Sequence, residues 1–184
     1  MIEAIARQEL IATVALVISN RADAAGLARA RDAGIETMVL PHGESSSREA
    51  YDGTLVAALR ARRIDLVCLA GFMRRLGPTF CAAFPQAVLN IHPSLLPAFP
   101  GIDAQRQALE YGVKTSGATV HFVTPDLDAG PIVAQAAVPV HDEDSVDSLT
   151  ARILAEEHRL YPRAIQRVLD GRWRIDGRRV IFQT

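Results

Sequence analysis

The sequence predicts an α/β protein built on a doubly wound, mostly parallel sheet with helices on both faces. Two observations lead to this fold class. Short and nearly continuous apolar runs, typical of strands buried on both faces, alternate with segments whose apolar residues recur at helical spacing. Strands that alternate with helices along a chain favour parallel pairing through crossover connections. With 184 residues and 49% hydrophobic content, residues 1–184 are expected to form a single domain.

The N-terminal half supplies this alternation. Apolar residues at Ile2, Ile5 and Ala6 predict a helix at the start of the chain. Strands are predicted at 11–19, 37–40, 65–70 and 87–92, and further helices at 22–33, 46–62 and 78–84. Gly34 is expected to end the second helix in a left-handed conformation. Ser45 or Ser46 is expected to cap the third helix, with Glu49 available for a capping box.

The C-terminal half predicts a mixed extension of the same sheet. A helix is predicted at 103–111, and strands of alternating character at 117–122 and 132–140. The longest helix, at 145–169, has Asp144 or Ser145 as its cap. Two short strands, at 173–175 and 178–181, flank Asp176-Gly177, a strong hairpin signal. The arginines of this hairpin are interpreted as a solvated edge that discourages pairing between sheets.

Composition narrows the class of function. The net charge of −1 argues against a broad nucleic-acid surface. No stretch is long and apolar enough to span a membrane, and the first residues lack the features of a signal peptide. Cys68 and Cys81 are isolated and are interpreted as reduced core residues. A cytoplasmic enzyme that acts on small molecules fits these observations. A monomer or a homodimer is expected, although composition does not choose between them.

The most informative stretch is Asn90-Ile91-His92-Pro93-Ser94-Leu95-Leu96-Pro97, at the end of a predicted strand. Residues two apart on a strand point to the same face, so Asn90 and His92 are expected to project side by side. Asp128, in a loop bounded by glycine and proline, could be held against them. An amide donor, an imidazole and a carboxylate are the groups needed to transfer an acyl group to an amine. The alternatives are a buried structural histidine and turn-forming Asn and Asp residues.

These motifs resemble those of the folate-dependent formyltransferases, and most closely those that act on glycinamide ribonucleotide. The resemblance runs from Met1 to about Ile181 and includes the Leu-Asp-x-Gly-Pro string around Asp128 and the blocks at 19–24, 47–52, 69–74 and 157–162. It implies a Rossmann-like fold and transfer of a formyl group from 10-formyltetrahydrofolate to the amine of glycinamide ribonucleotide in purine biosynthesis, without a metal. It also implies a cis peptide bond before Pro97.

The resemblance implies catalytic roles for Asn90, His92 and Asp128, and places further residues near the ligands. Asp128 is expected to hold His92 and to stabilise its charged form. The residues expected to contact folate, together with Asp128, are Met73, Arg74, His121, Val123 and Thr124. Those expected to contact the nucleotide substrate, together with Asn90, are Arg48 and Glu157. Each has a plainer interpretation: a loop before a helix for Met73 and Arg74, a core histidine for His121, and solvated helix positions for Arg48 and Glu157.

The start of the sequence departs from the family. Relatives begin with a strand and a glycine-rich loop that binds the substrate phosphate at a helix N-terminus. Neither is present here, so the domain is expected to be N-terminally incomplete, with a gap in its sheet. Two other interpretations stay open: a hydrolase resembling formyltetrahydrofolate deformylase, which typically has histidine where Pro93 stands, and a truncated, non-catalytic folate-binding relative.

Overall fold

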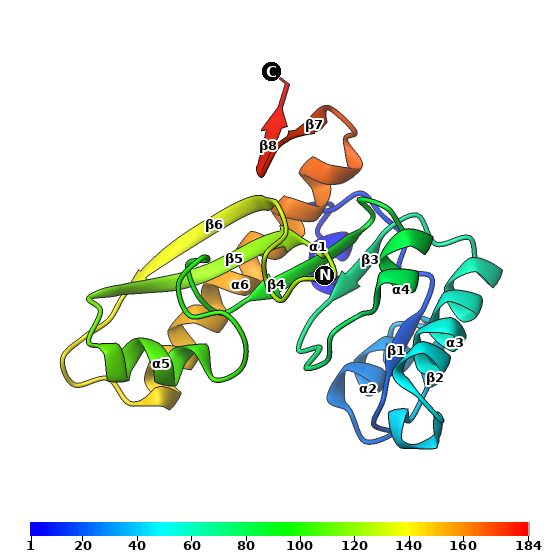
Figure 1. Ribbon diagram of the computed structural model, residues 1–184, viewed down its shortest axis with the longest axis horizontal. Helices are drawn as coiled ribbons and strands as arrows, with labels where there is room; N and C mark the ends of the chain where they lie inside the picture. The colour runs from blue at the N-terminus through cyan, green and yellow to red at the C-terminus, as the bar shows by residue number, and fades with distance from the viewer. Residues whose placement is uncertain (184) are drawn as a thin grey trace.

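In the computed structural model, which describes residues 1–183 apart from the side chain of Glu44, the strands form two sheets (Figure 1). One is a parallel pair, β1 (Val17–Ser19) and β2 (Thr37–Val39). The other has six strands in the spatial order β3 (Val67–Leu69), β4 (Val88–His92), β5 (Thr115–Phe122), β6 (Ile132–Pro139), β8 (Arg179–Phe182) and β7 (Trp173–Asp176). In this larger sheet, β3 with β4 and β6 with β8 are parallel, and the other neighbours are antiparallel. The α/β class and its mixed extension are therefore confirmed, but the sheet is mixed rather than mostly parallel, because β5 joins β4 and β6 through antiparallel pairing.

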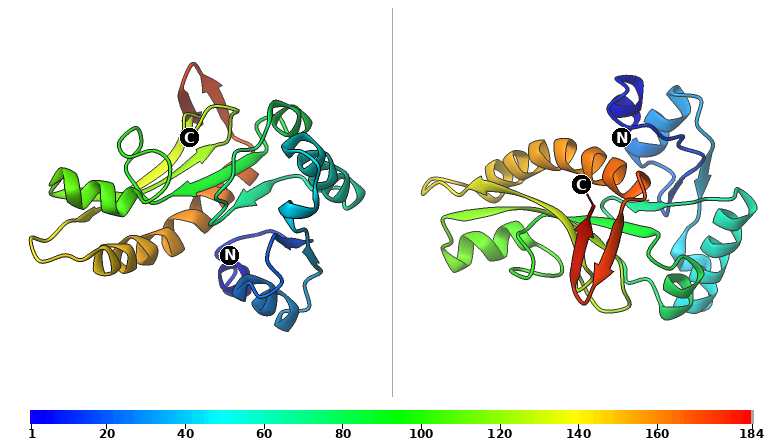
Figure 2. Two further views of the ribbon diagram at one scale, coloured as in Figure 1. Left: turned by 60° about the horizontal axis from the view of Figure 1, so that its bottom comes forward. Right: turned by 90° about the horizontal axis from the view of Figure 1, so that it is seen from above.

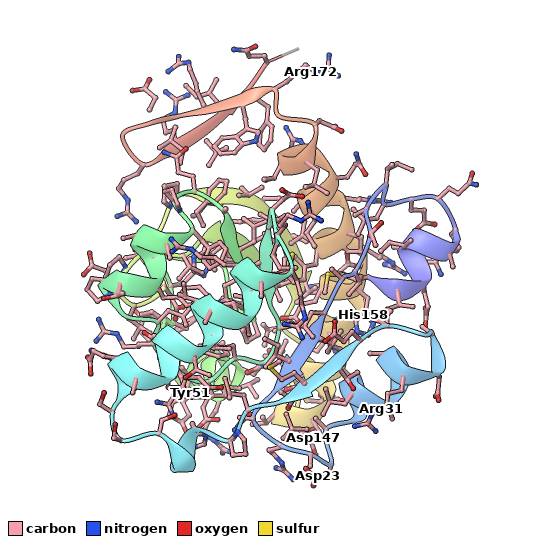
Figure 3. The ribbon with its side chains drawn as sticks, turned by 90° about the vertical axis from the view of Figure 1, so that its right-hand side faces the viewer. Asp23, Arg31, Tyr51, Asp147, His158 and Arg172 are labelled. Carbon is pink, nitrogen blue, oxygen red and sulfur yellow. The ribbon has the colours of Figure 1, made fainter. Side chains whose placement is uncertain are left out.

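The helices match the prediction in number and order, with one added 3₁₀ turn. They are α1 (Ile2–Ala6), α2 (Ala25–Asp32), the 3₁₀ turn η1 (His42–Glu44), α3 (Arg48–Ala61), α4 (Pro78–Ala83), α5 (Ala104–Tyr111) and α6 (Val146–Leu169). The long α6 lies along one face of the six-stranded sheet and packs on β5 and β6 (Figure 2). The β7–β8 hairpin, which begins just after Arg172, projects from one end of the molecule (Figure 3).

The first predicted strand is much shorter than expected. Residues 11–16 have no regular structure, and only Val17–Ser19 pair with a neighbour. These residues are half-buried, because β2 flanks β1 on one side and, among residues 1–183, no strand pairs with its other edge. The strands are thus divided into two sheets, with an interruption between β1 and β3. This interruption corresponds to the gap that the sequence led us to expect. An apolar run alone could not fix strand length, because a strand needs a hydrogen-bonding neighbour.

Helix and turn ends confirm some predictions and correct others. Gly34 has φ +70, and its N–H and that of Ile35 bond back to Arg31 and Ala30, which is a Schellman ending. The cap of α3 is Ser47, whose side chain accepts from the N–H of Ala50, rather than Ser45 or Ser46. Glu49 is consequently one position too early for the capping box. Ser145 caps α6 as predicted, in a capping box with Ser148.

The hairpin turn is shifted by one residue. Asp176 pairs with Arg179, so the two-residue connection is Gly177-Arg178 rather than Asp176-Gly177. Gly177 has φ +59, which glycine adopts at little cost as the first residue of such a turn.

One apolar cluster joins the two sheets. Side chains of α3 and α4, with Tyr51 and Phe80 fully buried, pack on β3 and β4, on Ile18 of β1 and on Leu40, the residue after β2. A second cluster joins Ala4 and Leu10 at the N-terminus to β4, β5 and α6. Both cysteines are free, as expected. No helix among the described residues is long and apolar enough to cross a membrane.

Candidate active site

The site forms where β3, β4 and β5 lie side by side. The register pairs Leu69 with Asn90 on the parallel side, and Asn90 with His121 on the antiparallel side. His92, two residues further along β4, pairs with Thr119, which lies two residues before His121 on the antiparallel β5. Sheet register thus brings a histidine that is 31 residues away in sequence against Asn90.

A loop between β5 and β6 carries Asp128 into this site. Asp128 has φ 45, a left-handed conformation that Asp tolerates better than most residues, and its Oδ2 accepts the N–H of Gly101 at 2.8 Å. Gly130 is required beside it: an added Cβ would lie 1.8 Å from the carbonyl oxygen of Phe122. Close backbone contact at Gly130 and the bond to Gly101 therefore fix the carboxylate in place.

Asp128 lies between two histidines. Its Oδ2 is 3.5 Å from Nδ1 of His92, and its Oδ1 is 3.7 Å from Nε2 of His121. The side chains of His92, His121 and Asp128 are 6%, 3% and 12% exposed, so these three polar groups are largely shielded from water. We call Asn90, His92, His121 and Asp128 the polar quartet.

The hydrogen bonds of His92 assign a role to each ring nitrogen. Nε2 lies 2.8 Å from the carbonyl oxygen of Phe99. Because a carbonyl oxygen only accepts, Nε2 carries the proton and donates. Nδ1 is therefore the nitrogen that faces Asp128 and can exchange a proton in the site.

His121 is held in the opposite tautomer. Its Nδ1 donates to the carbonyl of Phe122 at 2.9 Å, and its Nε2 lies 3.3 Å from the Nδ2 of Asn90. Burial lowers the pKa of His121, although the Phe122 carbonyl and the Asp128 charge act against that shift. A neutral ring fits this geometry, because unprotonated Nε2 can accept from the Asn90 amide. We therefore interpret the contact between His121 and Asp128 as proximity rather than an ion pair.

The quartet can perform acyl-transfer chemistry. His121 uses one N–H of the Asn90 amide, which leaves the other for a substrate carbonyl. A donor at this position stabilises the oxyanion of a tetrahedral intermediate. The His92–Asp128 pair can accept and return protons. Asn90 and His92, which were predicted to lie side by side, both belong to this site.

The cis peptide bond predicted at Leu96–Pro97 is present.

Among residues 1–183, the other predicted ligand residues form no hydrogen bond or ion pair with the quartet. Met73 and Arg74 lie in the segment after β3, whose last residue, Leu69, pairs with Asn90. Met73 is 78% exposed, and the Arg74 guanidinium lies 5.0 Å from the centre of the Tyr51 ring on α3. Val123 and Thr124 continue the segment from His121 towards Asp128. Arg48, the first residue of α3, is exposed and lies 3.6 Å from Glu49.

Glu157 is half-buried on α6, and burial raises its carboxyl pKa. One turn further along α6, the Tyr161 hydroxyl donates to the carbonyls of Leu69 and Leu89 at 2.9 and 3.0 Å. No sequence signal indicated this role, because an apolar helix face predicts a tyrosine ring but not its partners. Tyr161 therefore anchors α6 to the end of β3 and to β4, one helical turn from Glu157.

A metal site has no support in the described part of the chain. Residues 1–183 contain no cluster of three or more His, Cys, Asp or Glu side chains arranged to hold an ion.

Comparison with known proteins gives one family. The family model described as formyl transferase matches residues 1–165. The chain is 46% identical to phosphoribosylglycinamide formyltransferase of Escherichia coli, over 98% of this chain and 88% of that protein. It is 50% identical to the trifunctional purine biosynthetic protein adenosine-3 of Drosophila melanogaster, over 89% of this chain but only 12% of that protein's length.

Solved structures agree with this result. Glycinamide ribonucleotide transformylase 1 from Symbiobacterium toebii superposes with a TM-score of 0.97 at 53% identity, covering all of this chain and 86% of that one. A formyltetrahydrofolate deformylase from Pseudomonas syringae superposes with a TM-score of 0.88 at 30% identity, over 99% of this chain and 60% of that one.

Proposed function

Because the chain belongs to the formyl transferase family, we propose that it transfers a formyl group from 10-formyltetrahydrofolate to the amine of glycinamide ribonucleotide, a step of purine biosynthesis. The observation that carries this proposal is the polar quartet, in which a buried carboxylate, a histidine with one free nitrogen and an amide with one free N–H meet at the ends of paired strands.

The reaction forms one C–N bond and breaks another. The substrate amine attacks the formyl carbon, and the carbonyl oxygen becomes an oxyanion. The free N–H of Asn90 and the protonated ring of His92 stabilise that oxyanion. Asp128 holds His92 and, through water, helps to move a proton from the attacking amine to the departing folate nitrogen.

The ligands are assigned to the two sides of the quartet. Folate binds against Met73, Arg74 and the segment that includes His121, Val123 and Thr124 before Asp128. The nucleotide binds towards Arg48, Asn90 and Glu157, where the half-buried carboxylate of Glu157 is suited to accept hydrogen bonds from ribose hydroxyls. We further propose that the enzyme is cytoplasmic, acts as a monomer or homodimer on small molecules only, and uses no metal.

A deformylase activity is the second candidate, favoured by the likeness to the Pseudomonas syringae enzyme. There, water would attack the formyl carbon in place of the amine, and formate would leave. Pro93, which follows the proposed catalytic histidine here, argues against it. A non-catalytic folate-binding role would require that the four side chains of the quartet take no part in any reaction.

The test is a product analysis with purified protein. With 10-formyltetrahydrofolate and glycinamide ribonucleotide, the expected products are formylated nucleotide and tetrahydrofolate, identified by mass. Formate release that does not depend on the nucleotide would instead assign a deformylase. Folate binding without any turnover, together with a His92→Ala variant that behaves like the parent protein, would assign the non-catalytic role.

A further inference from the structure

The turn that follows β4 is held by two residues outside the polar quartet. Thr119 on β5 donates its hydroxyl to the carbonyl of Ser94 at 2.7 Å and accepts the N–H of Leu96 at 3.0 Å. Gln135 on β6 donates Nε2 to the Thr119 hydroxyl and to the carbonyl of Leu96, both at 2.9 Å. Thr119 is fully buried and uses every hydrogen-bonding site of its hydroxyl.

Sheet register explains why Gln135 reaches this turn. Gln135 is directly opposite Thr119 in the antiparallel pair of β5 and β6, so both side chains lie on the face where the turn packs. Gln135 lies at an exposed position of β6, where a polar side chain commonly points into solvent. Its amide instead donates to the Leu96 carbonyl of the turn and to the Thr119 hydroxyl, two bonds that a solvent-facing glutamine would not make.

The same turn fixes the orientation of His92. Phe99, which ends it, provides the carbonyl that accepts from Nε2 of His92 at 2.8 Å. Inside the turn, the Ser94 hydroxyl donates to the carbonyl of Ala98 at 2.5 Å. The same hydroxyl lies 3.3 Å from the carbonyl of Phe99. Hydrogen bonds and the backbone and side chain of Ser94 therefore connect Gln135, through Thr119, to the carbonyl that accepts from the imidazole of His92.

We propose that Gln135 is a positioning residue for His92: acting through Thr119 and the turn at 94–99, it holds the Phe99 carbonyl where that carbonyl keeps the proton on Nε2 and directs Nδ1 to Asp128. This inference rests on the proposed function for its kinetic consequences. Its structural consequence concerns His92 alone and does not depend on any substrate.

The test compares Gln135→Leu, which keeps the size of the side chain and removes both bonds, with Gln183→Leu at an exposed glutamine beyond β8. For Gln135→Leu we expect kcat to fall by about tenfold with KM for both substrates nearly unchanged, because misplacing a catalytic group impairs the chemical step more than binding. The imidazole ¹H–¹⁵N spectrum of the ligand-free protein should show a shifted or broadened Nε2–H signal of His92. Gln183→Leu should match the parent protein in both measurements.

Thr119 provides the conservative comparison. Thr119→Ser keeps the hydroxyl and should retain kcat, whereas Thr119→Val should lower kcat as Gln135→Leu does. The Gln135→Leu/Thr119→Val double variant should lose little more than either single variant, since both act through one network. A folded Gln135→Leu protein with the parent's kcat and His92 signal overturns the proposal, as does an equal rise in both KM values with kcat unchanged. If the parent protein transfers no formyl group, the proposed function fails, while a displaced His92 signal in Gln135→Leu still supports the positioning role.

Discussion

Replacing Asp128 by asparagine isolates the role of its charge. The new side chain in Asp128→Asn keeps the size of the old one and tolerates the same left-handed backbone, and its carbonyl oxygen could still accept the N–H of Gly101. What disappears is the negative charge 3.5 Å from Nδ1 of His92. That charge matters most when His92 carries a second proton in the transition state.

The size of the effect follows from this distance. At an effective dielectric constant of about 20, unit charges 3.5 Å apart attract by about 4–5 kcal/mol. Part of this is offset by the cost of burying both groups, so we expect a loss of about 2–4 kcal/mol in transition-state stabilisation. A loss of that size lowers kcat by about 30- to 1,000-fold.

Steady-state formyl transfer, with folding checked by circular dichroism, measures this effect. Asp126→Asn is the matched control, since Asp126 is an exposed carboxylate in the same loop and should tolerate the change. A folded Asp128→Asn protein with kcat within about twofold of the parent would show that the charge does not act on the reaction, and the assignment of the His92–Asp128 pair would fall.

Three further predictions concern the same site. His92→Ala and Asn90→Ala should each lower turnover by roughly a hundredfold or more in the same assay, and normal turnover in either would remove that residue from the mechanism. Gly130→Ala should lower the thermal unfolding midpoint, because the new Cβ meets the Phe122 carbonyl oxygen; an unchanged midpoint would mean that the loop moves freely. Glu157→Gln should stabilise the protein more at pH 7 than at about pH 4, measured by denaturant unfolding. Burial raises the folded-state pKa of Glu157, so the protonated carboxyl stabilises the folded protein fully below the unfolded-state pKa, and this stabilisation is lost as pH rises through the folded-state pKa. The glutamine variant does not lose it. A difference in unfolding free energy between variant and parent that does not change with pH contradicts this prediction.

Much of the candidate site could be predicted from sequence because its signals are local. Asn90 and His92 are two residues apart at the end of an apolar run, and a strand sends both to one face. Glycine and proline around Asp128 indicated a constrained loop, and Leu96–Pro97 is cis as the resemblance implied. The alternation of strands and helices could be predicted for the same reason, because hydrophobic periodicity depends only on residues that are close together in sequence.

The sequence by itself therefore determined the class of fold, the family and the choice of Asn90, His92 and Asp128 as candidate catalytic residues. Tertiary structure decided how far each strand extends, since residues 11–16 remain unpaired despite their apolar character. It also decided the partners of these side chains: His121, a candidate from sequence, bonds to Asn90, while Tyr161 on β3 and β4 and Gln135 on the turn had no sequence signal. These contacts join residues that are distant in sequence and are brought together by strand register and packing. Long-range hydrogen bonds of this kind produce no periodic pattern in the sequence, so the sequence could not predict them.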